Sequence, residues 1–191
     1  MDKRIYKTKK GLQEALQELL GEMSFDKISV SQICERAATS RVTFYMYYND
    51  KYDLLSDLYD TMAEKAEMNF MQKQKENNPG NETNQSLENL LDVLIAFEKE
   101  PAATAARVVS ERKITHLYME FILRCIEKFE TISPLFSQSR YPEKALNSFF
   151  AFGLWGFLHS SNGEITEQDR KNASRLLKDL VNSPIFREEI K

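Results

Sequence analysis

The chain has 191 residues, and 26 Lys and Arg against 29 Asp and Glu give it a formal net charge of -3. Hydrophobic residues make up 42% of it and aromatic residues 11%, which is enough for a folded core, while only 6 Gly and 5 Pro exclude collagen-like and low-complexity chains. No stretch approaches the ~18–20 apolar residues of a membrane span, and the charged start is unlike a secretory signal. Two cysteines cannot build a disulfide framework, so we expect a protein of the reducing cytoplasm.

Cations gather at the beginning of the chain. Residues 1–55 hold 9 basic and 8 acidic side chains, so the acidic excess belongs to the remainder. The first ten residues alone contain Lys3, Arg4, Lys7, Lys9 and Lys10. This run is either a solvated tail or a basic arm ahead of a nucleic-acid-binding unit. An apolar stripe then predicts an amphipathic helix over about 7–22, and its members are Leu12, Leu16, Leu19, Leu20 and Met23.

Two short helices are predicted next, separated by a three-residue break. Ser29 and Gln32 match a capping box, in which the Ser hydroxyl accepts from a backbone N–H and the Gln side chain reaches back. After the break at 38–40, a further helix is expected over about Arg41 to Tyr48. This order is typical of a helix-turn-helix, whose second helix enters the major groove of DNA.

The second of these helices is expected to have two faces. Phe44 and Tyr48 lie one turn apart and would anchor the helix on its neighbours. The other side chains suit DNA, because Arg bonds guanine bidentately, Val and Thr methyl groups contact thymine methyls, and hydroxyl groups bond phosphate. Lys51 opens the following helix, where a cation opposes the helix dipole, and contact with phosphate would explain it. The alternatives are that the aromatic residues of 44–48 all pack and that Lys51 is a solvated surface residue.

The runs 29–38 and 40–51 resemble the DNA-binding domain of the TetR family of bacterial regulators. The resemblance covers about residues 7–59 and rests on Thr43, Phe44, Tyr45, Tyr48 and Lys51. It implies a homodimer that binds a palindromic operator in double-stranded DNA, with a C-terminal domain that senses a ligand or a partner. It also places seven residues at positions that contact DNA in the family, namely Ser31, Arg41, Val42, Thr43, Tyr45, Tyr47 and Lys51. Where the family commonly has Gly in the turn, this chain has Ala38.

Helical periodicity continues to the end of the chain, so we predict an all-α protein. A long helix from Lys51 is expected to end at the polar breaker 76–84. Further helices are expected over about 87–95, 102–109, 117–129, 142–160 and 167–181. We assign residues 1–55 to a helix-turn-helix DNA-binding domain and residues 56–191 to a helical regulatory and dimerisation domain.

The last two predicted helices are candidates for a dimer interface. Residues 149–158 contain no polar side chain, and a helix that is apolar all round needs cover on every side. Either the chain buries this helix centrally, or one face meets a second subunit, as the family resemblance implies for these two helices. We predict an isologous dimer through Phe149, Phe152, Gly153, Gly156, Phe157, Leu176, Leu177 and Leu180.

A pocket for a small apolar or aromatic effector would be lined by Met62, Phe97, Phe121, Ile122, Cys125 and Trp155, although such residues are more often plain core. Neither His116 nor His159 has a neighbour with metal-ligand spacing, so we expect no metal and no cofactor. No phosphate loop, G-x-S-x-G or HExxH motif supports an enzyme. The function we expect is a dimeric DNA-binding regulator, a repressor released by a small molecule. The alternative is a TetR-like regulator or coactivator whose C-terminal domain binds a protein.

Overall fold

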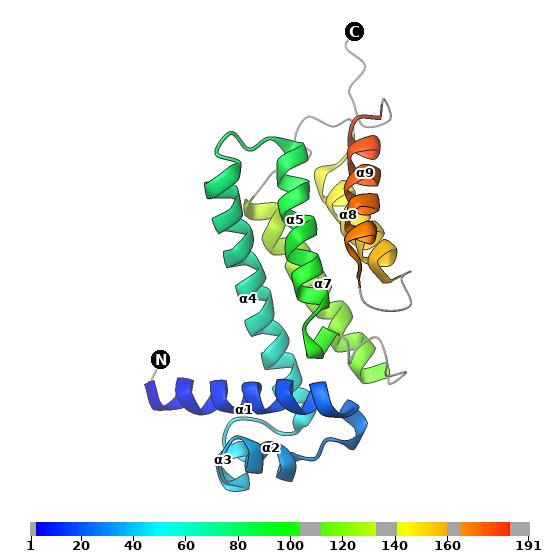
Figure 1. Cartoon of the computed structure of the whole chain (residues 1–191). Helices are drawn as coiled ribbons and strands as arrows, with labels where there is room; N and C mark the ends of the chain where they lie inside the picture. The colour runs from blue at the N-terminus through cyan, green and yellow to red at the C-terminus, as the bar shows by residue number, and fades with distance from the viewer. Residues whose placement is uncertain (1–2, 104–111, 133–140, 160–164, 184–191) are drawn as a thin grey trace. The chain divides into compact units, whose positions relative to one another are not determined.

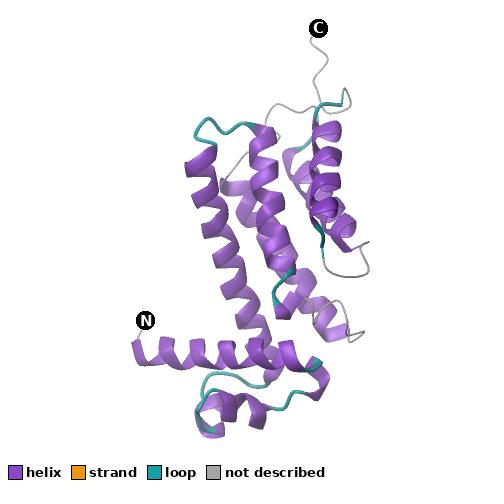
Figure 2. Ribbon diagram, in the orientation of Figure 1, coloured by secondary structure: helices purple, strands orange, loops and turns teal. Residues whose placement is uncertain are grey.

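The computed structural model describes residues 3–103, 112–132, 141–159 and 165–183 (Figure 1). All regular secondary structure in these residues is helical, which confirms the predicted all-α class (Figure 2). The chain forms two compact units, one from Met1–Ala63 with Glu100–Phe121 and the other from Glu64–Lys99 with Ile122–Lys191. Among the described residues, no helix is long and apolar enough to cross a membrane.

The first unit begins with α1 (Lys3–Glu22), η1 (Phe25–Lys27), α2 (Val30–Arg36) and α3 (Arg41–Tyr45). Helix α1 starts four residues earlier than predicted, so the basic run 3–10 is helical and is not an extended arm. Helix α3 ends at Tyr45 and not at Tyr48, because Met46 is its C-cap and a turn follows. In Figure 1, α2 and α3 lie together along one side of α1.

The apolar face of α1 forms one side of the hydrophobic core of this unit. Leu12, Leu16 and Leu19 are buried, as their helical spacing predicts. They are joined in the core by side chains from the next three elements and the segments between them, namely Phe25, Ile28, Ile33, Cys34, Phe44 and Tyr48. Burial of large apolar side chains from every element fixes the short helices, which could not form alone.

Helix α4 (Lys51–Asn77) is capped by Asp50, whose Oδ1 accepts from the backbone N–H groups of Tyr52 and Asp53. It ends at the polar breaker, as predicted, where Asn78 precedes Pro79 and Gly80. The helix runs unbroken through residues 55 and 56, between which the sequence places the domain boundary, and it enters the second unit at Glu64. The division into residues 1–55 and 56–191 stays a prediction.

The second unit contains the end of α4 with α5 (Thr83–Glu98), the later part of α7 (Arg112–Ile132), α8 (Glu143–His159) and α9 (Glu167–Val181). The predicted ranges 142–160 and 167–181 agree with α8 and α9 to within one residue. Most of the helix predicted over 102–109 lies outside the described residues. Helices α5, α8 and α9 pack on one another through a core of Leu87, Leu91, Ile95, Leu146, Phe150, Leu154, Leu158, Ala173 and Leu177.

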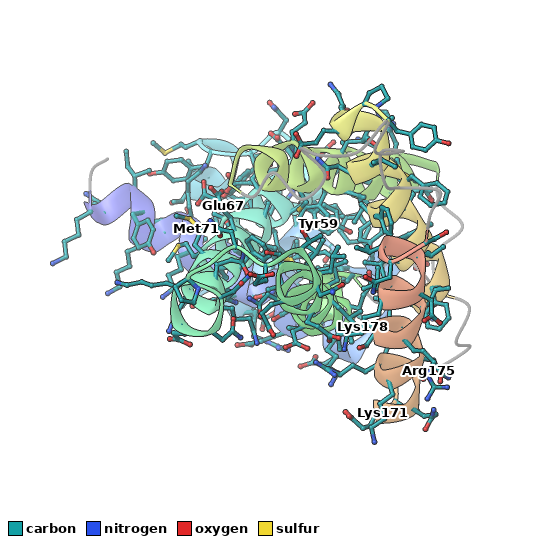
Figure 3. All side chains as sticks on the ribbon, turned by 90° about the horizontal axis from the view of Figure 1, so that it is seen from above. Tyr59, Glu67, Met71, Lys171, Arg175 and Lys178 are labelled. Carbon is teal, nitrogen blue, oxygen red and sulfur yellow. The ribbon has the colours of Figure 1, made fainter. Side chains whose placement is uncertain are left out.

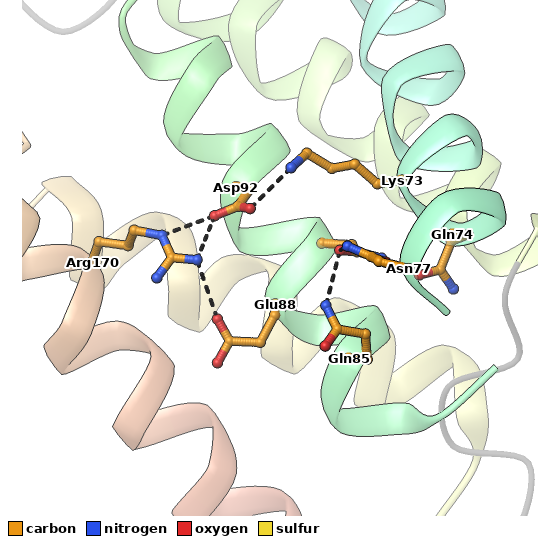
Figure 4. A network of polar contacts seen from close by, with 8 residues as sticks. Lys73, Gln74, Asn77, Gln85, Glu88, Asp92 and Arg170 are labelled. Carbon is orange, nitrogen blue, oxygen red and sulfur yellow. Dashed lines mark hydrogen bonds and ion pairs between the residues drawn. The ribbon is translucent and has the colours of Figure 1, made fainter. Parts of the chain in front are cut away.

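A charged network ties three helices of this unit together. The Asp92 carboxylate accepts from Lys73 of α4 at 3.0 Å and from Arg170 of α9 at 2.7 Å (Figure 4). The Glu88 carboxylate accepts from Lys178 at 2.8 Å and from the hydroxyl of Ser174. These pairs lie at the rim of the apolar core, where they fix the register of α9 on α5.

Candidate nucleic-acid interface

The turn between α2 and α3 is a Schellman motif. The Thr39 N–H donates to the Cys34 carbonyl at 2.9 Å, and the Ala38 N–H donates to the Glu35 carbonyl at 3.1 Å. This pattern places Ala38 in the left-handed region, with φ 48°. Glycine is the residue that adopts this region without a steric penalty, so Ala38 carries backbone strain in the turn.

Both short helices have side-chain caps. The predicted capping box is confirmed, since Ser29 accepts from the Gln32 N–H while Gln32 Oε1 accepts from the Ser29 N–H at 2.9 Å. Ser40 caps α3 by accepting from the Thr43 N–H at 3.0 Å. The hydroxyl groups of Ser40 and Thr43 are also 2.9 Å apart and hydrogen-bonded to each other. The Thr43 hydroxyl is therefore engaged by the cap before any DNA is bound.

A carboxylate on α4 holds the end of the α3 segment. Tyr48 donates from its hydroxyl to Asp57 Oδ2 at 2.5 Å, and the same carboxylate accepts from Lys9 at 3.2 Å and Gln13 at 2.9 Å. Burial raises the pKa of Tyr48 well above its usual value, and the hydrogen bond to Asp57 raises it further. Three segments of the first unit thus meet at Asp57.

Lys51 lies at the start of α4 with its ammonium group turned toward η1. Its Nζ donates to the carbonyls of Phe25 at 2.8 Å, Ile28 at 2.9 Å and Asp26 at 3.2 Å. The ammonium also lies 4.5 Å from the centre of the Phe25 ring, within range of a cation–π interaction. In this conformation its three donors satisfy backbone carbonyls, so Lys51 has a structural role that the sequence pattern did not reveal.

The first turn of α7 also contacts the beginning of α4. Lys113 Nζ lies 3.3 Å from Asp50 Oδ2 and 3.9 Å from the centre of the Tyr52 ring. Burial opposes ionisation of Asp50, but the Asp53 N–H and the Lys113 ammonium together hold the pKa of Asp50 below its ordinary value. Nothing in the local sequence predicts this contact, because its partners are 63 residues apart.

Most of the residues predicted to contact DNA are solvent-exposed. Ser31, Arg41, Val42 and Tyr45 are exposed, whereas Thr43, Tyr47 and Lys51 are half-buried. The side chain of Arg41 makes no hydrogen bond or ion pair with any described residue, so its guanidinium is available to a ligand. Met46 is 72% exposed on the same segment, although the sequence did not predict it as a contact. Phe44 and Tyr48 are buried, so the alternative that all the aromatic residues pack does not describe Tyr45.

More cations lie on the outer face of α1. Lys3, Arg4, Lys7 and Lys10 are exposed, while Lys9 is half-buried in its ion pair with Asp57. Lys10 Nζ lies 3.6 Å from Glu14 Oε1. Both side chains are exposed, so this ion pair contributes little to stability. The helical form of this run gives its cations fixed positions, which a solvated tail would lack.

The residues predicted for an effector pocket fall on both units. Met62, Phe97, Phe121, Ile122 and Cys125 are buried and Trp155 is half-buried. Figure 3 shows Tyr59 in the interior, where its hydroxyl donates to the Ala102 carbonyl at 3.2 Å. These positions fit an apolar core, and the effector pocket stays a prediction.

The residues predicted for a dimer interface divide into two groups. Leu177 is buried in the core of the second unit, and Phe157 and Leu180 pack against that core. By contrast, Phe149 is 58% exposed, Leu176 is 40% exposed, and Gly153 and Gly156 are exposed. Phe152 is half-buried. On α9 the exposed cations Lys171 and Arg175 project away from the core, whereas Lys178 points toward α5, where it pairs with Glu88 (Figure 3).

Residues 12–58 match the family described as bacterial regulatory proteins, tetR family. The chain carries an N-terminal helix-turn-helix domain of the TetR family. This TetR-type domain is also 36% identical over 53 residues to an uncharacterized HTH-type transcriptional regulator, YxbF, of Bacillus subtilis (strain 168). That match covers 28% of this chain and spans 14% of the length of the relative.

Solved structures share the fold well beyond the TetR-type domain. A TetR-family transcriptional regulator from Streptomyces coelicolor has a TM-score of 0.69 at 13% identity, over 91% of this chain and 97% of that one. A TetR-family protein from Syntrophomonas wolfei has a TM-score of 0.69 at 14% identity, over 94% and 97%. A transcriptional regulator from Aquifex aeolicus VF5 has a TM-score of 0.65 at 22% identity, over 91% and 99%. At these identities the likeness establishes the fold.

Proposed function

We propose that the chain is a dimeric DNA-binding transcriptional regulator of the TetR type. The observation that carries the proposal is α3, a capped helix with Phe44 buried beneath it and with Arg41, Val42 and Tyr45 exposed on its outer side. A helix presented in this way fits the major groove, and Arg41 is placed to donate bidentately to guanine. Ser31, Thr43 and Tyr47 would lie at the edges of the contact and bond phosphate.

The cations of α1 would supply sequence-independent attraction to the phosphate backbone. Exposed Lys3, Arg4, Lys7 and Lys10 offer a positive face on a chain whose net charge is -3. Because few cations take part, affinity depends on two subunits binding neighbouring half-sites about one helical turn apart. Lys51 would reach phosphate only by giving up one of its carbonyl partners, so its main contribution to DNA binding is to fix the start of α4.

A second copy of the chain would cover the exposed face of α8. Phe149, Gly153 and Gly156 follow one another at helical spacing. Apart from the adjacent residues and the backbone of the same helix, no described atom lies within 4 Å of a Cβ built on either glycine. Glycine inside a helix costs about 0.5–1 kcal/mol relative to Ala. Packing among the described residues gives no reason for this cost, whereas close approach of a second backbone would give one. The interface would be isologous.

The proposed regulator acts as a repressor in the cytoplasm, and a small apolar or aromatic effector releases it from DNA. The second unit would hold this effector, since it contains four of the six residues predicted to line the pocket, namely Phe97, Ile122, Cys125 and Trp155. Binding of the effector would favour a dimer whose two α3 helices no longer match the half-site spacing.

Selection of bound duplexes from random double-stranded DNA tests the proposal. The full chain should enrich a two-fold symmetric sequence and bind it more tightly than random DNA, with affinity that falls as salt is raised. Arg41→Ala should cost about 1–3 kcal/mol on the selected sequence and little on random DNA. Arg175→Ala on α9 is the matched control and should change neither. Failure to enrich any sequence, or an equal loss for Arg41→Ala on both DNAs, would contradict the proposal.

A further inference from the structure

Helix α3 and its C-cap expose two large apolar side chains. Among the large apolar side chains of the described residues, Val42 and Met46 are the two most exposed, at 75% and 72%. They are four residues apart, and the Met46 N–H donates to the Val42 carbonyl at 3.2 Å, so both side chains lie on one face of one helical turn. This apolar pair, Val42 with Met46, forms the tip of the helix-turn-helix.

The fold does not need the apolar pair. The packing of this segment is supplied by Phe44, with 0% exposure, and by Tyr48, whose hydroxyl is held by Asp57. A Val and a Met left in water at the tip gain nothing from burial within the chain. Both side chains are therefore free to contact a ligand that offers an apolar surface at this position.

Polar base readers are scarce on the same turn. Arg41 is the one cation between Ser40 and Tyr48, and the Thr43 hydroxyl is already bonded to Ser40. The base edges of the major groove carry donors and acceptors for polar side chains, and the one apolar group they offer is the C5-methyl of thymine. The apolar pair lies beside Arg41 on the face that the proposed function turns toward this groove.

We infer that Val42 and Met46 read thymine by its methyl group, so that each half-site combines a guanine bound by Arg41 with neighbouring thymines that cover the apolar pair. The inference rests on the proposed function and specifies the ligand of the same surface. Specificity then depends on desolvation of methyl groups as well as on hydrogen bonds.

Replacement of thymine by deoxyuridine in the selected duplex tests the inference, because it removes the methyl group and keeps base pairing and the hydrogen-bonding edge. Binding of the full chain is followed by fluorescence anisotropy at one fixed salt concentration. We expect each contacted position to lose about fourfold in affinity per methyl group. The variant with Val42→Ala and Met46→Ala should bind the thymine and deoxyuridine duplexes alike.

Met68→Ala is the matched control, since Met68 is 67% exposed on α4 and lies outside the TetR-type domain. It should discriminate thymine from deoxyuridine as the parent chain does. Equal affinity of the parent chain for both duplexes would overturn thymine reading and leave the proposed function intact. Full discrimination by the double Ala variant would overturn the assignment to Val42 and Met46. If selection enriches no duplex, the proposed function itself fails, and the inference fails with it.

Discussion

At the scale of single residues, Ala38 and Lys51 of the TetR-type domain each make hydrogen bonds that shape the local structure. Ala38 closes the Schellman motif at φ 48°, and its side chain is exposed. Lys51 occupies all three of its donors on the carbonyls of residues 25, 26 and 28. Ala38 carries strain that a glycine would relieve, and Lys51 satisfies three backbone carbonyls to which no other described side chain donates.

Ala38→Gly should stabilise the protein. The Cβ of Ala is penalised in the left-handed region, and Gly removes this penalty. The greater entropy of Gly in the unfolded chain offsets part of the gain, so the free energy of unfolding should rise by about 1 kcal/mol. Thermal unfolding followed by circular dichroism should show a rise of about 2–4 °C. Asn81→Gly is the control, since Asn81 is also left-handed, at φ 53°, but Asn tolerates this region better and should gain less. A lower melting temperature for Ala38→Gly would contradict the assigned strain.

Lys51→Met should destabilise the domain even without DNA. Met has an apolar chain of similar length to that of Lys, but it cannot donate to the backbone carbonyls of Phe25 and Ile28. The loss of this donor should lower the free energy of unfolding by about 1–3 kcal/mol. Urea unfolding measures this cost. Lys27→Met, at an exposed position of η1, serves as the comparison and should change little. Unchanged stability together with weaker DNA binding would show that Lys51 serves phosphate alone.

At the scale of helices, α5 and α9 are joined by an apolar seam and by the charged network at its rim. Burial opposes ionisation of both carboxylates, but bonds from Lys178 and Ser174 hold the pKa of Glu88 below its ordinary value, and bonds from Lys73 and Arg170 do the same for Asp92. A carboxylate with a lowered pKa stabilises the folded state above the pKa it has when unfolded. That stabilisation is lost as the pH falls through the pKa of the folded state.

Acid should therefore weaken the second unit. The stabilising effect is complete above the ordinary pKa values of 4.5 for Glu88 and 3.8 for Asp92, and it disappears progressively below them. The urea midpoint should therefore fall as the pH is lowered from about 5 through the lowered pKa values of the two carboxylates. Glu88→Gln should lower the midpoint at neutral pH and reduce its pH dependence. Glu64→Gln, at an exposed position of α4, is the control. An unaltered pH dependence in Glu88→Gln would show that the network does not act in this way.

At the scale of the whole molecule, the proposed function requires two copies of the chain. Helix α8 turns Leu146, Phe150, Leu154 and Leu158 into its own core and leaves Phe149, Gly153 and Gly156 on the other side. One helix thus supplies an internal and an external apolar face, which explains why residues 149–158 contain no polar side chain. In the proposed complex, dimer formation would also bring two α3 helices to one DNA molecule.

Gly153→Lys should dissociate the dimer and leave the subunit folded. Lys favours a helix by about 0.5–1 kcal/mol over Gly, so the subunit itself should not be weakened, but its side chain and charge would keep a second backbone away. Light scattering should report the mass of one chain, and affinity for the selected DNA should fall by at least tenfold, because the two half-sites are no longer bound together. Gly21→Lys on α1 is matched to it, since a Cβ there also has no described atom within 4 Å apart from the adjacent residues and the backbone of the same helix. A dimeric Gly153→Lys would place the interface elsewhere.

The sequence by itself determined the features that depend on neighbouring residues. The spacing of Leu12, Leu16 and Leu19 predicted the buried face of α1, and Ser29 with Gln32 predicted a cap that the structure contains. The ends of α9 and the break after α4 followed in the same way. Hydrogen-bonding and apolar periodicity within four residues decide such features, so they can be read along the chain.

Only the tertiary structure decided what the ends of the side chains contact. Lys51 has the sequence position of a phosphate ligand, yet it donates to carbonyls 23–26 residues away. Met46 is an apolar residue of a type common in protein cores, yet it is exposed, because Phe44 and Tyr48 already fill the core at this segment. Asp57 gathers Lys9, Gln13 and Tyr48 from two other segments. The physical reason is common to all three, because the direction and the partner of a long side chain depend on segments that meet only when the helices pack.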